Sequence, residues 1–368
     1  MAIYGKKDVK ERIVALTRDL ILIPSTVSRP VERLRCYEFI KNHLEALDQI
    51  KVREYESKGI PSLLATAEGI NKPKILLCGH LDVIDHPDKA SYHSVVKEGR
   101  IYGPGSGDMK GALAILLEVF RNIHSQKPDA SLGIAITSDE ESGGASGIGF
   151  LVARKGLSCK SAIIPDGGSL NEITVEEKGI LHLKISSYGH PVHSARPWLG
   201  KNPIQELMGG IIKVQSYFDS LKTEGHWYPT CAVTIISTEN KTINRIPSQA
   251  QAVLDIRFPP PFKVDSLTSK IKEILGKNYG IEKILGAGPT HLSPDPLYQK
   301  ITEEVTGKKA VFIRDDGGSD ARYLAPRGIP VMMSRPIVGN LHAEDEWVDI
   351  DSMVLLYEIY ERYLLNKL

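Results

Sequence analysis

Histidines and carboxylates follow several apolar segments of the sequence, and their types and spacing are typical of a metal centre. The clusters that contain them are GHLD (79–82), GPGSGDMKG (103–111), DEE (139–141), PDGG (165–168) and NLHAE (340–344). If the apolar segments are strands of one open sheet, their carboxyl ends meet in a single crevice, where ligands collect. Imidazole nitrogen and carboxylate oxygen suit zinc and also bind other divalent metals. The sequence therefore predicts a metal site at one edge of a sheet.

The first cluster joins a histidine to a carboxylate that can orient it. His80 ends an apolar run, and Asp82 lies two residues further along. Side chains two residues apart in a strand point to the same face. Asp82 can then accept the second ring N–H of His80 and fix its tautomer, as metal-bound histidines require. On these two residues alone, an uncharged core histidine stays an open alternative.

The glycine-rich cluster is superficially similar to a dinucleotide-binding loop, but its residue types favour a metal ligand. Pro104 has no N–H to offer a phosphate, and Asp108 would place negative charge where a pyrophosphate should sit. We therefore favour a carboxylate ligand over the nicotinamide-dependent oxidoreductase that a nucleotide loop would indicate. A serine hydrolase is disfavoured as well, because the sequence has no G-x-S-x-G motif.

The remaining clusters supply more carboxylates and a second histidine. Asp139, Glu140 and Glu141 directly follow the apolar run LGIAITS. A solvated acidic turn is the alternative, but adjacent carboxylates at a strand end can diverge, one towards a metal and its neighbour towards the metal's water. Asp166 ends the run SAIIP in a similar way, and His342 follows the loop after IPVMMS.

The elements that position these side chains alternate along the first part of the chain. Short apolar runs predict buried strands, and we assign them to residues 62–67, 74–78, 132–137 and 162–164. Helical periodicity predicts helices over residues 7–22, 30–47 and 110–125. Strands that alternate with helices indicate an α/β layer fold.

The pattern changes near residue 180 and returns near residue 293. Between them, alternating strands are expected over residues 181–188, 231–238, 250–258 and 281–287, with helices over 203–221 and 264–275. A further strand (329–333) and a closing helix (353–365) follow. We therefore expect an α/β/α catalytic domain with a mixed sheet, formed by residues 1–179 and 293–368. An α+β sandwich, residues 180–292, is inserted into it.

Charge and composition exclude several classes of protein. The 368 residues carry a formal net charge of +1, which argues against a broad nucleic-acid or membrane surface. No run reaches the roughly 18 to 20 apolar residues of a membrane helix, and residues 1–20 lack the apolar core of a signal peptide. The four cysteines lie far apart without a CxxC pair. We expect a cytoplasmic protein without a disulfide framework.

Five motifs in a fixed order make the chain resemble a known family. The motifs are GHLDV, GPGSGDMKG, SDEESGG, PDGG and NLHAEDE. The chain resembles the dizinc hydrolases that include succinyl-diaminopimelate desuccinylase, acetylornithine deacetylase, glutamate carboxypeptidase, aminoacylase and several di- and tripeptidases. The resemblance covers nearly the whole chain, including the inserted domain, for which it implies a role as lid and dimerisation domain. It implies two divalent metal ions, zinc or else cobalt or manganese.

The resemblance also assigns metal ligands residue by residue. Asp108 is expected to bridge both ions, and a non-proline cis peptide bond is expected after it. His80 and Asp166 complete the coordination of one ion. Glu141 and His342 complete that of the other.

The resemblance implies three further catalytic roles. Glu140 is the general base, and Asp82 orients His80. His193, in GHPVHS, is expected to reach the active site of a partner subunit and to stabilise the developing oxyanion there. The partner that follows is a second copy of the same chain.

Residues of the inserted domain and of a glycine loop are expected to contact substrate. Asn244 in TINRIP and Arg257 in LDIRF match substrate-contacting positions of the family, and arginine suits a carboxylate because it binds it in a bidentate manner. Arg257 can instead pair with Asp255. Gly318 and Ser319 match the glycine loop that lines the substrate pocket.

The function that the resemblance implies is metal-dependent hydrolysis of an amide bond in a small N-acyl amino acid or short peptide. We expect a deacylase of amino-acid metabolism, similar to the desuccinylases and deacetylases. Those relatives usually carry glutamate at the position of Asp166, whereas aspartate is commoner in the aminopeptidase-like and dipeptidase branches. A di- or aminopeptidase or a carboxypeptidase is therefore the alternative. A catalytically silent relative that only binds ligands is the alternative from a different class.

Overall fold

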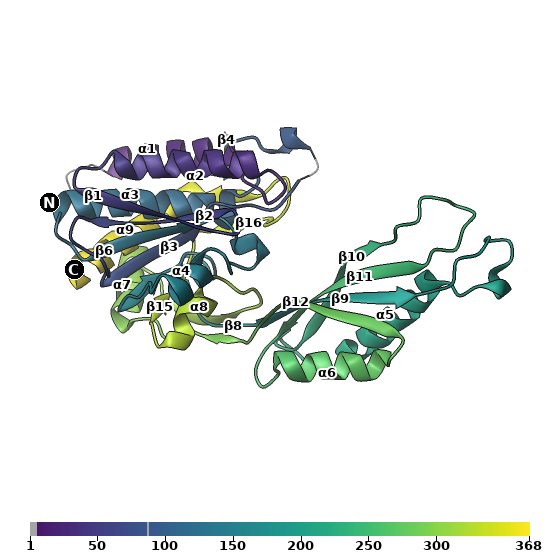
Figure 1. The fold of residues 1–368 in the computed structure, drawn as a ribbon. Coiled ribbons are helices and arrows are strands. Elements are labelled where there is room, and N and C mark those ends of the chain that lie inside the picture. Colours follow the sequence, from purple (N-terminus) through teal and green to yellow (C-terminus); the bar gives the residue numbers. More distant parts are fainter. Residues whose placement is uncertain (1–5, 87) are drawn as a thin grey trace. The chain divides into compact units, whose positions relative to one another are not determined.

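The structure, a computed structural model, describes residues 6–86 and 88–368, which divide into two compact units (Figure 1). The first unit runs up to Glu176 and resumes over His291–Asp315 and Ser319–Leu368. The second comprises Glu177–Thr290 and Asp316–Gly318, so the segment that carries Gly318 groups with the inserted unit. The prediction about a signal peptide rests on a stretch that begins in residues 1–5, which lie outside the described residues.

A six-stranded mixed sheet forms the centre of the first unit. Its strands, in the order β1-β2-β6-β3-β7-β15, are β1 (Ile50–Ser57), β2 (Ile60–Ala67), β6 (Leu132–Thr137), β3 (Ile75–His80), β7 (Ser161–Ile163) and β15 (Val331–Met332). The pairs β1–β2 and β2–β6 are antiparallel, and the strands from β6 to β15 are parallel. The apolar runs assigned to buried strands form β2, β3, β6 and β7. The predicted α/β class with a mixed sheet is confirmed.

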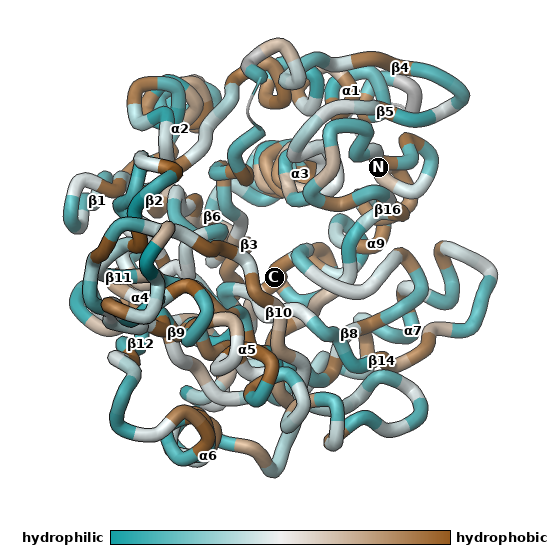
Figure 2. Tube along the Cα trace, turned by 90° about the vertical axis from the view of Figure 1, so that its right-hand side faces the viewer, coloured by the Kyte–Doolittle hydropathy of each residue, from teal (hydrophilic) through white to brown (hydrophobic). Residues whose placement is uncertain are grey.

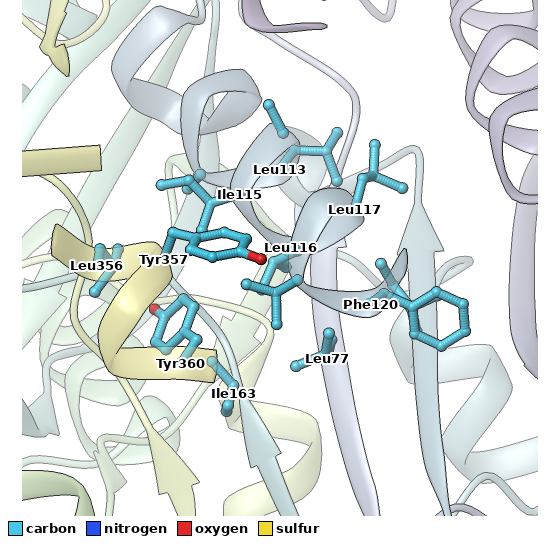
Figure 3. Packing of buried hydrophobic residues seen from close by; sticks show 14 of the residues in the cluster. Leu77, Leu113, Ile115, Leu116, Leu117, Phe120, Ile163, Leu356, Tyr357 and Tyr360 are labelled. Carbon is cyan, nitrogen blue, oxygen red and sulfur yellow. The ribbon is translucent and has the colours of Figure 1, made fainter. Parts of the chain in front are cut away.

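Helices cover both faces of this sheet (Figure 1). They are α1 (Lys6–Ile21), α2 (Pro30–Glu45), α3 (Gly111–Gln126), α4 (Ile148–Arg154), α7 (Pro296–Thr306), α8 (Ala321–Leu324) and α9 (Ile350–Lys367). Because consecutive strand residues point to opposite faces, Leu77 packs in the cluster with α1, α3 and α9, whereas Leu76 packs in the cluster with α4 and α8. Figure 3 shows part of the first cluster, with Leu116 of α3 between Tyr357 of α9 and Leu77 of β3. None of the described helices is long and apolar enough to cross a membrane.

Two small sheets flank the large one, and the sequence analysis predicted neither. One has the order β16-β17-β5-β4, with β4 (Val95–Lys97), β5 (Arg100–Tyr102), β16 (Val338–Gly339) and β17 (Trp347–Asp349). The other has the order β13-β8-β14, with β8 (Glu172–Glu177), β13 (Thr290–His291) and β14 (Val311–Asp315). Several of these strands have only two or three residues, which is too short for a clear alternation of polar and apolar residues.

The second unit is a four-stranded antiparallel sheet packed against two helices. The sheet order is β10-β11-β9-β12, with β9 (Gly179–Tyr188), β10 (Thr230–Ser237), β11 (Gln249–Phe258) and β12 (Tyr279–Ala287). Every second residue of β11 is buried against α5 (Pro203–Asp219) and α6 (Val264–Leu275). Figure 2 shows α6 end-on, with hydrophobic residues along one side and hydrophilic residues along the other. This is the α+β unit that the sequence analysis expected.

Candidate metal centre

Three neighbouring parallel strands end side by side and present polar side chains. His80 is the last residue of β3, Glu140 and Glu141 follow β6, and Asp166 follows β7. Strand β3 lies between β6 and β7 and is parallel to both. Because the carboxyl ends of parallel strands share one edge of the sheet, these side chains converge although they are far apart in the sequence.

Asp108 reaches the same place from a turn, Ser106–Lys110, directly before α3. Gly105, which precedes the turn, has a φ of 79°, a left-handed conformation that glycine adopts readily. The Asp108–Met109 peptide bond is cis, as the resemblance implied.

Lys110 ties this turn to the end of α1. Its fully buried ammonium group donates hydrogen bonds to the carbonyl oxygens of Leu20 (2.9 Å) and Ile23 (2.6 Å). Burial lowers the pKa of Lys110, and its neighbours Cys36 and Glu346 oppose that effect. The sequence analysis assigned no role to this lysine.

Six predicted site residues form two groups that could each hold a metal ion. In each group, one potential ligand atom from every member lies within 4.8 Å of the others. The first group is His80, Glu140 and Asp166, and the second is Asp108, Glu141 and His342. Asp108 also faces both histidines, because its Oδ1 lies 3.2 Å from His80 Nε2 and its Oδ2 lies 3.4 Å from His342 Nε2. The structure thus brings together all five predicted ligands and the predicted general base.

Two buried ligand atoms, His80 Nε2 and Asp108 Oδ1, face each other without forming a hydrogen bond. His80 Nδ1 lies 3.0 Å from the main-chain oxygen of Asp82, a contact that is favourable only when Nδ1 carries a proton. Within the described residues, His80 Nε2 and Asp108 Oδ1 are buried and lack a hydrogen-bond partner, as does Glu141 Oε1. Orphaned buried acceptors are costly, and a divalent cation between them would satisfy all three. The residues present therefore fit a metal ion.

The electrostatics of the site lead to the same conclusion. Burial and the charge of Asp108 raise the pKa of both Glu141 and Asp166 well above the ordinary values. Burial disfavours a charged His80, yet the nearby carboxylates of Asp108 and Asp82 raise its pKa well above the usual range. Burial also opposes the charge of Asp108, but the nearby imidazoles of His342 and His80 hold its pKa far below the ordinary value. A site that attracts protons in this way attracts metal ions through the same groups.

Asp82 makes contacts that the sequence analysis did not foresee. Its carboxylate accepts the main-chain N–H groups of Glu140 (3.2 Å) and Glu141 (3.0 Å). The predicted contact between this carboxylate and His80 Nδ1 is longer, 3.5 Å, because Nδ1 faces the carbonyl oxygen of Asp82 instead. Asp82 therefore orients His80 through its main chain and the acidic turn after β6 through its side chain.

An arginine holds the predicted general base. Arg322 Nη2 donates a hydrogen bond to Glu140 Oε1 at 3.0 Å, and only 7% of the Arg322 side chain and 11% of the Glu140 side chain are exposed. Burial raises the pKa of Glu140, whereas His80 and Arg322 lower it. Arg322 lies three residues after Ser319 of the glycine loop, and the sequence analysis gave it no role.

The predicted substrate residues of the second unit lie in one loop region and on β11. His193 is exposed, and its Nδ1 accepts the N–H of Ala195 at 3.1 Å, so its Nε2 carries the proton in the neutral ring. The carbonyl oxygen of Asn244 accepts the N–H of Ser194 at 2.9 Å, which holds the two predicted residues close together.

Arg257 forms the ion pair that the sequence analysis named as the alternative. Its Nε and Nη2 donate to the two carboxylate oxygens of Asp255 at 2.7 and 3.1 Å. Burial opposes the charge of Asp255, but His182 and Arg257 hold its pKa well below the ordinary value. Ser319 of the glycine loop is fully buried, and its hydroxyl accepts the N–H of Ala321 at 3.1 Å.

Comparison with known proteins identifies relatives over the full length of the chain. The family model "Peptidase family M20/M25/M40" matches residues 76–366. A succinyl-diaminopimelate desuccinylase from Xanthobacter autotrophicus is 28% identical and aligns over 95% of this chain and 98% of its own. One from Bordetella parapertussis is 26% identical over 97% and 98% of the two chains.

Solved structures share the fold at lower sequence identity. The metallo-carboxypeptidase Sso-CP2 from Sulfolobus solfataricus has a TM-score of 0.78 and 20% identity, with 96% of this chain and 98% of that chain covered. Human carnosine dipeptidase 1 also has a TM-score of 0.78, at 15% identity, with 98% and 96% covered. At these identities the likeness establishes the fold, including its separate second unit.

Loss of one histidine is expected to empty one metal position. We predict that the wild-type chain retains two divalent ions after dialysis, and that His342→Ala retains about one, because the group around Asp108 and Glu141 then lacks its only imidazole. Elemental analysis by mass spectrometry measures the ratio. His291→Ala, an exposed histidine outside both groups, serves as the control. Equal metal content in His342→Ala and the wild type would contradict the assignment.

Proposed function

The chain belongs to peptidase family M20/M25/M40 and is thus a metal-dependent amide-bond hydrolase, and we propose that it removes the acyl group from a small N-acyl amino acid. The observation that carries the proposal is the convergence of His80, Asp166, Asp108, Glu141 and His342 at one edge of the sheet. The desuccinylase relatives, which align over nearly their full lengths, support an acyl amino acid as substrate.

A short-peptide substrate is the second candidate. Asp166 favours it, since the resemblance associates aspartate at this position with the dipeptidase and aminopeptidase-like branches. The fold is also shared with a dipeptidase and a carboxypeptidase. Both candidates require the same hydrolysis of an amide bond. They differ in the carboxylic acid that is released with the amine: a simple acid from an N-acyl amino acid, and an amino acid or peptide from a short peptide.

We propose zinc as the metal and two ions as the number. Asp108 would lie between the ions, His80 and Asp166 would hold one, and Glu141 and His342 would hold the other. When bound, a pair of divalent ions lowers the pKa of a shared water and polarises the scissile carbonyl group. The donor set of two imidazoles and three carboxylates contains no sulfur ligand, so cobalt and manganese stay alternatives.

Proton transfer is assigned to Glu140. Its carboxylate takes the proton from the attacking water and delivers it to the nitrogen of the leaving amine. Burial raises the pKa of Glu140 towards the value that such a dual role requires. Arg322 fixes one carboxylate oxygen of Glu140, which leaves the other oxygen for the water. Asp82 keeps the turn of Glu140 in place through the two main-chain amides.

A second copy of the chain is the proposed partner. Strand β10 is an edge strand of the second unit, and its Ile235 and Ile236 are 55% and 64% exposed. Met208 and Ile212 of the neighbouring α5 are also exposed. An apolar edge strand is a template for pairing with another chain. In such a dimer, the Nε2–H of His193 is proposed to donate to the oxyanion that forms in the partner's active site.

We also propose that the protein works in the cytoplasm, in amino-acid metabolism. All four cysteines, which lie within the described residues, are free, as is usual where thiols are kept reduced. Subcellular fractionation of cells that naturally contain the protein, followed by an activity assay of each fraction, tests the cytoplasmic location.

A substrate screen tests the proposed reaction. We expect the zinc- or cobalt-loaded chain to give its highest kcat/KM with an N-succinyl or N-acetyl amino acid, compared with dipeptides and with peptides that end in glutamate. A higher value with a peptide would replace the deacylase by the second candidate. If the chain binds metal and hydrolyses none of these compounds, it is a silent relative and the proposal is wrong.

Glu140→Gln is expected to reduce kcat by about 10²- to 10⁴-fold, because the variant cannot accept the proton from water. Its metal content is expected to equal that of the wild type. Both quantities are measured on the same preparation, with Glu56→Gln, an exposed carboxylate on β1, as the control. Because Glu140 groups with His80 and Asp166, a parallel loss of metal would show that it is a ligand and not the base.

Sedimentation of the purified chain tests the dimer. We predict a species of twice the 40.6 kDa chain mass, and a shift towards the monomer for Ile236→Asp, because burying a charge at the interface is costly. Ile284→Asp is the matched control, since Ile284 is 54% exposed on β12, the opposite edge of the same sheet. A monomeric wild type would remove the proposed role of His193.

A further inference from the structure

Glu346 is a buried carboxylate beside the metal centre that has no place in the mechanism above. It lies four residues after His342 and directly before β17, and only 1% of it is exposed. A carboxylate is rarely buried to this degree unless its oxygens have partners. The partners of Glu346 identify what it does.

The side chain of Glu346 binds the main chain of the turn that carries Asp108. Its Oε1 accepts the N–H groups of Gly107 (2.7 Å) and Asp108 (2.8 Å), and its Oε2 accepts that of Gly105 (3.0 Å). The main-chain oxygen of Glu346 accepts a fourth N–H, that of Gly103, at 2.8 Å. One residue that is distant in sequence therefore accepts four main-chain N–H groups between Gly103 and Asp108.

The glycines of this turn make the contact sterically possible. A Cβ atom at Gly107 would lie 3.1 Å from Glu346 Oε1, 2.8 Å from a methyl carbon of Leu341 and 3.0 Å from Cβ of Val338. Contacts this short require the neighbours to move, so glycine at this position lets the carboxylate approach the amide without displacing them. The run of glycines before Asp108 thus matches the carboxylate that faces it.

Glu346 connects two ligands of one metal position. Asp108 lies in the turn that Glu346 holds, and His342 lies on the segment that carries Glu346. Their ligand atoms, Asp108 Oδ2 and His342 Nε2, are 3.4 Å apart and both face Glu141. Without a link between the two segments, each ligand would have to be ordered separately when an ion binds.

We propose that Glu346 is a positioning residue that fixes the Asp108 turn to the His342 segment and so preorganises the metal position of Asp108, Glu141 and His342. The inference rests on the proposed function, since it concerns the same metal centre. It differs from a purely structural role, in which loss of the carboxylate would lower the stability of the fold and leave the metal affinity unchanged.

Glu346→Gln tests the proposal with little change of shape. Three N–H donors converge on the two carboxylate oxygens, whereas glutamine offers one oxygen and turns an NH₂ group towards at least one of the donors. We expect the weaker of two cobalt-binding steps, measured by titration of the metal-free protein and followed by the visible absorption of bound Co²⁺, to weaken by about 10- to 100-fold. We also expect faster amide hydrogen exchange in the metal-free peptide 103–110, a readout that needs no bound metal.

The matched control is Glu118→Gln. Glu118, on the helix α3 that follows the turn, is 3% exposed, accepts hydrogen bonds from Arg12 and Arg121, and lies outside both ligand groups. Its loss is expected to lower stability to urea while both cobalt steps stay as in the wild type. If Glu346→Gln does not fold, Glu346→Asp replaces it, because the shorter side chain keeps the charge but cannot reach all three amides.

The outcomes separate this inference from the proposed function. Unchanged cobalt binding and unchanged exchange in a folded Glu346 variant overturn the positioning role and leave the hydrolase intact. An equal loss of cobalt affinity in Glu118→Gln also overturns it, because the effect then follows stability alone. A wild-type chain that binds no cobalt overturns the metal centre itself, and the positioning role with it.

Discussion

The main physical constraint on the candidate site is the mutual repulsion of carboxylates that are buried together at one edge of the sheet. Five of them lie at the ends of β3, β6 and β7 and in the turn before α3, namely Asp82, Asp108, Glu140, Glu141 and Asp166. Each charge that is removed from water costs free energy, and neighbouring charges of the same sign add to the cost. The raised pKa values of Glu141 and Asp166 express this cost directly. Only protons or cations relieve it, so the arrangement is one that bound metal ions stabilise.

A set of ligands on turns needs a rigid support, and the support here is built from other carboxylates. Asp82 accepts the amides of Glu140 and Glu141, and Glu346 accepts the amides around Asp108. In both cases an acidic side chain does not serve as a metal ligand. It binds the main chain of a turn that carries ligands. Side chains that are fixed in this way keep the ligand geometry within the narrow limits that metal binding and catalysis require.

The sequence predicted many of the elements that have a long periodic pattern, although the strand β1 and the helix α7 were missed. The helix over residues 264–275 coincides with α6, and the strand over residues 132–137 coincides with β6. Strands β4, β5, β16 and β17 were missed because two or three residues carry no detectable alternation, and their pairing depends on partners far along the chain.

The same distinction applies to the site. Its residues were named from motifs in a fixed order, and the structure brings six of them together. Contacts that join distant segments were not predictable in this way. Arg322 meets Glu140 across 182 positions, and Glu346 meets Asp108 across 238. A pattern confined to one short segment holds no information on such pairs. Glu346 stood within the motif NLHAEDE and Arg322 just after the glycine loop, and only a search for unassigned charged residues in and beside such motifs could have singled them out.

Arg257 shows how an ion pair and a substrate contact can share one side chain. Its guanidinium group has five N–H donors, and Asp255 takes one from Nε and one from Nη2. Three donors stay available, including a pair on Nη1 and Nη2 that can bind a second carboxylate in a bidentate manner. Asp255, itself held by His182 at 3.4 Å, then acts as a brace that sets the direction of this free edge. The ion pair with Asp255 therefore does not exclude the predicted contact with a substrate carboxylate, and it supplies the rigidity that such a contact needs.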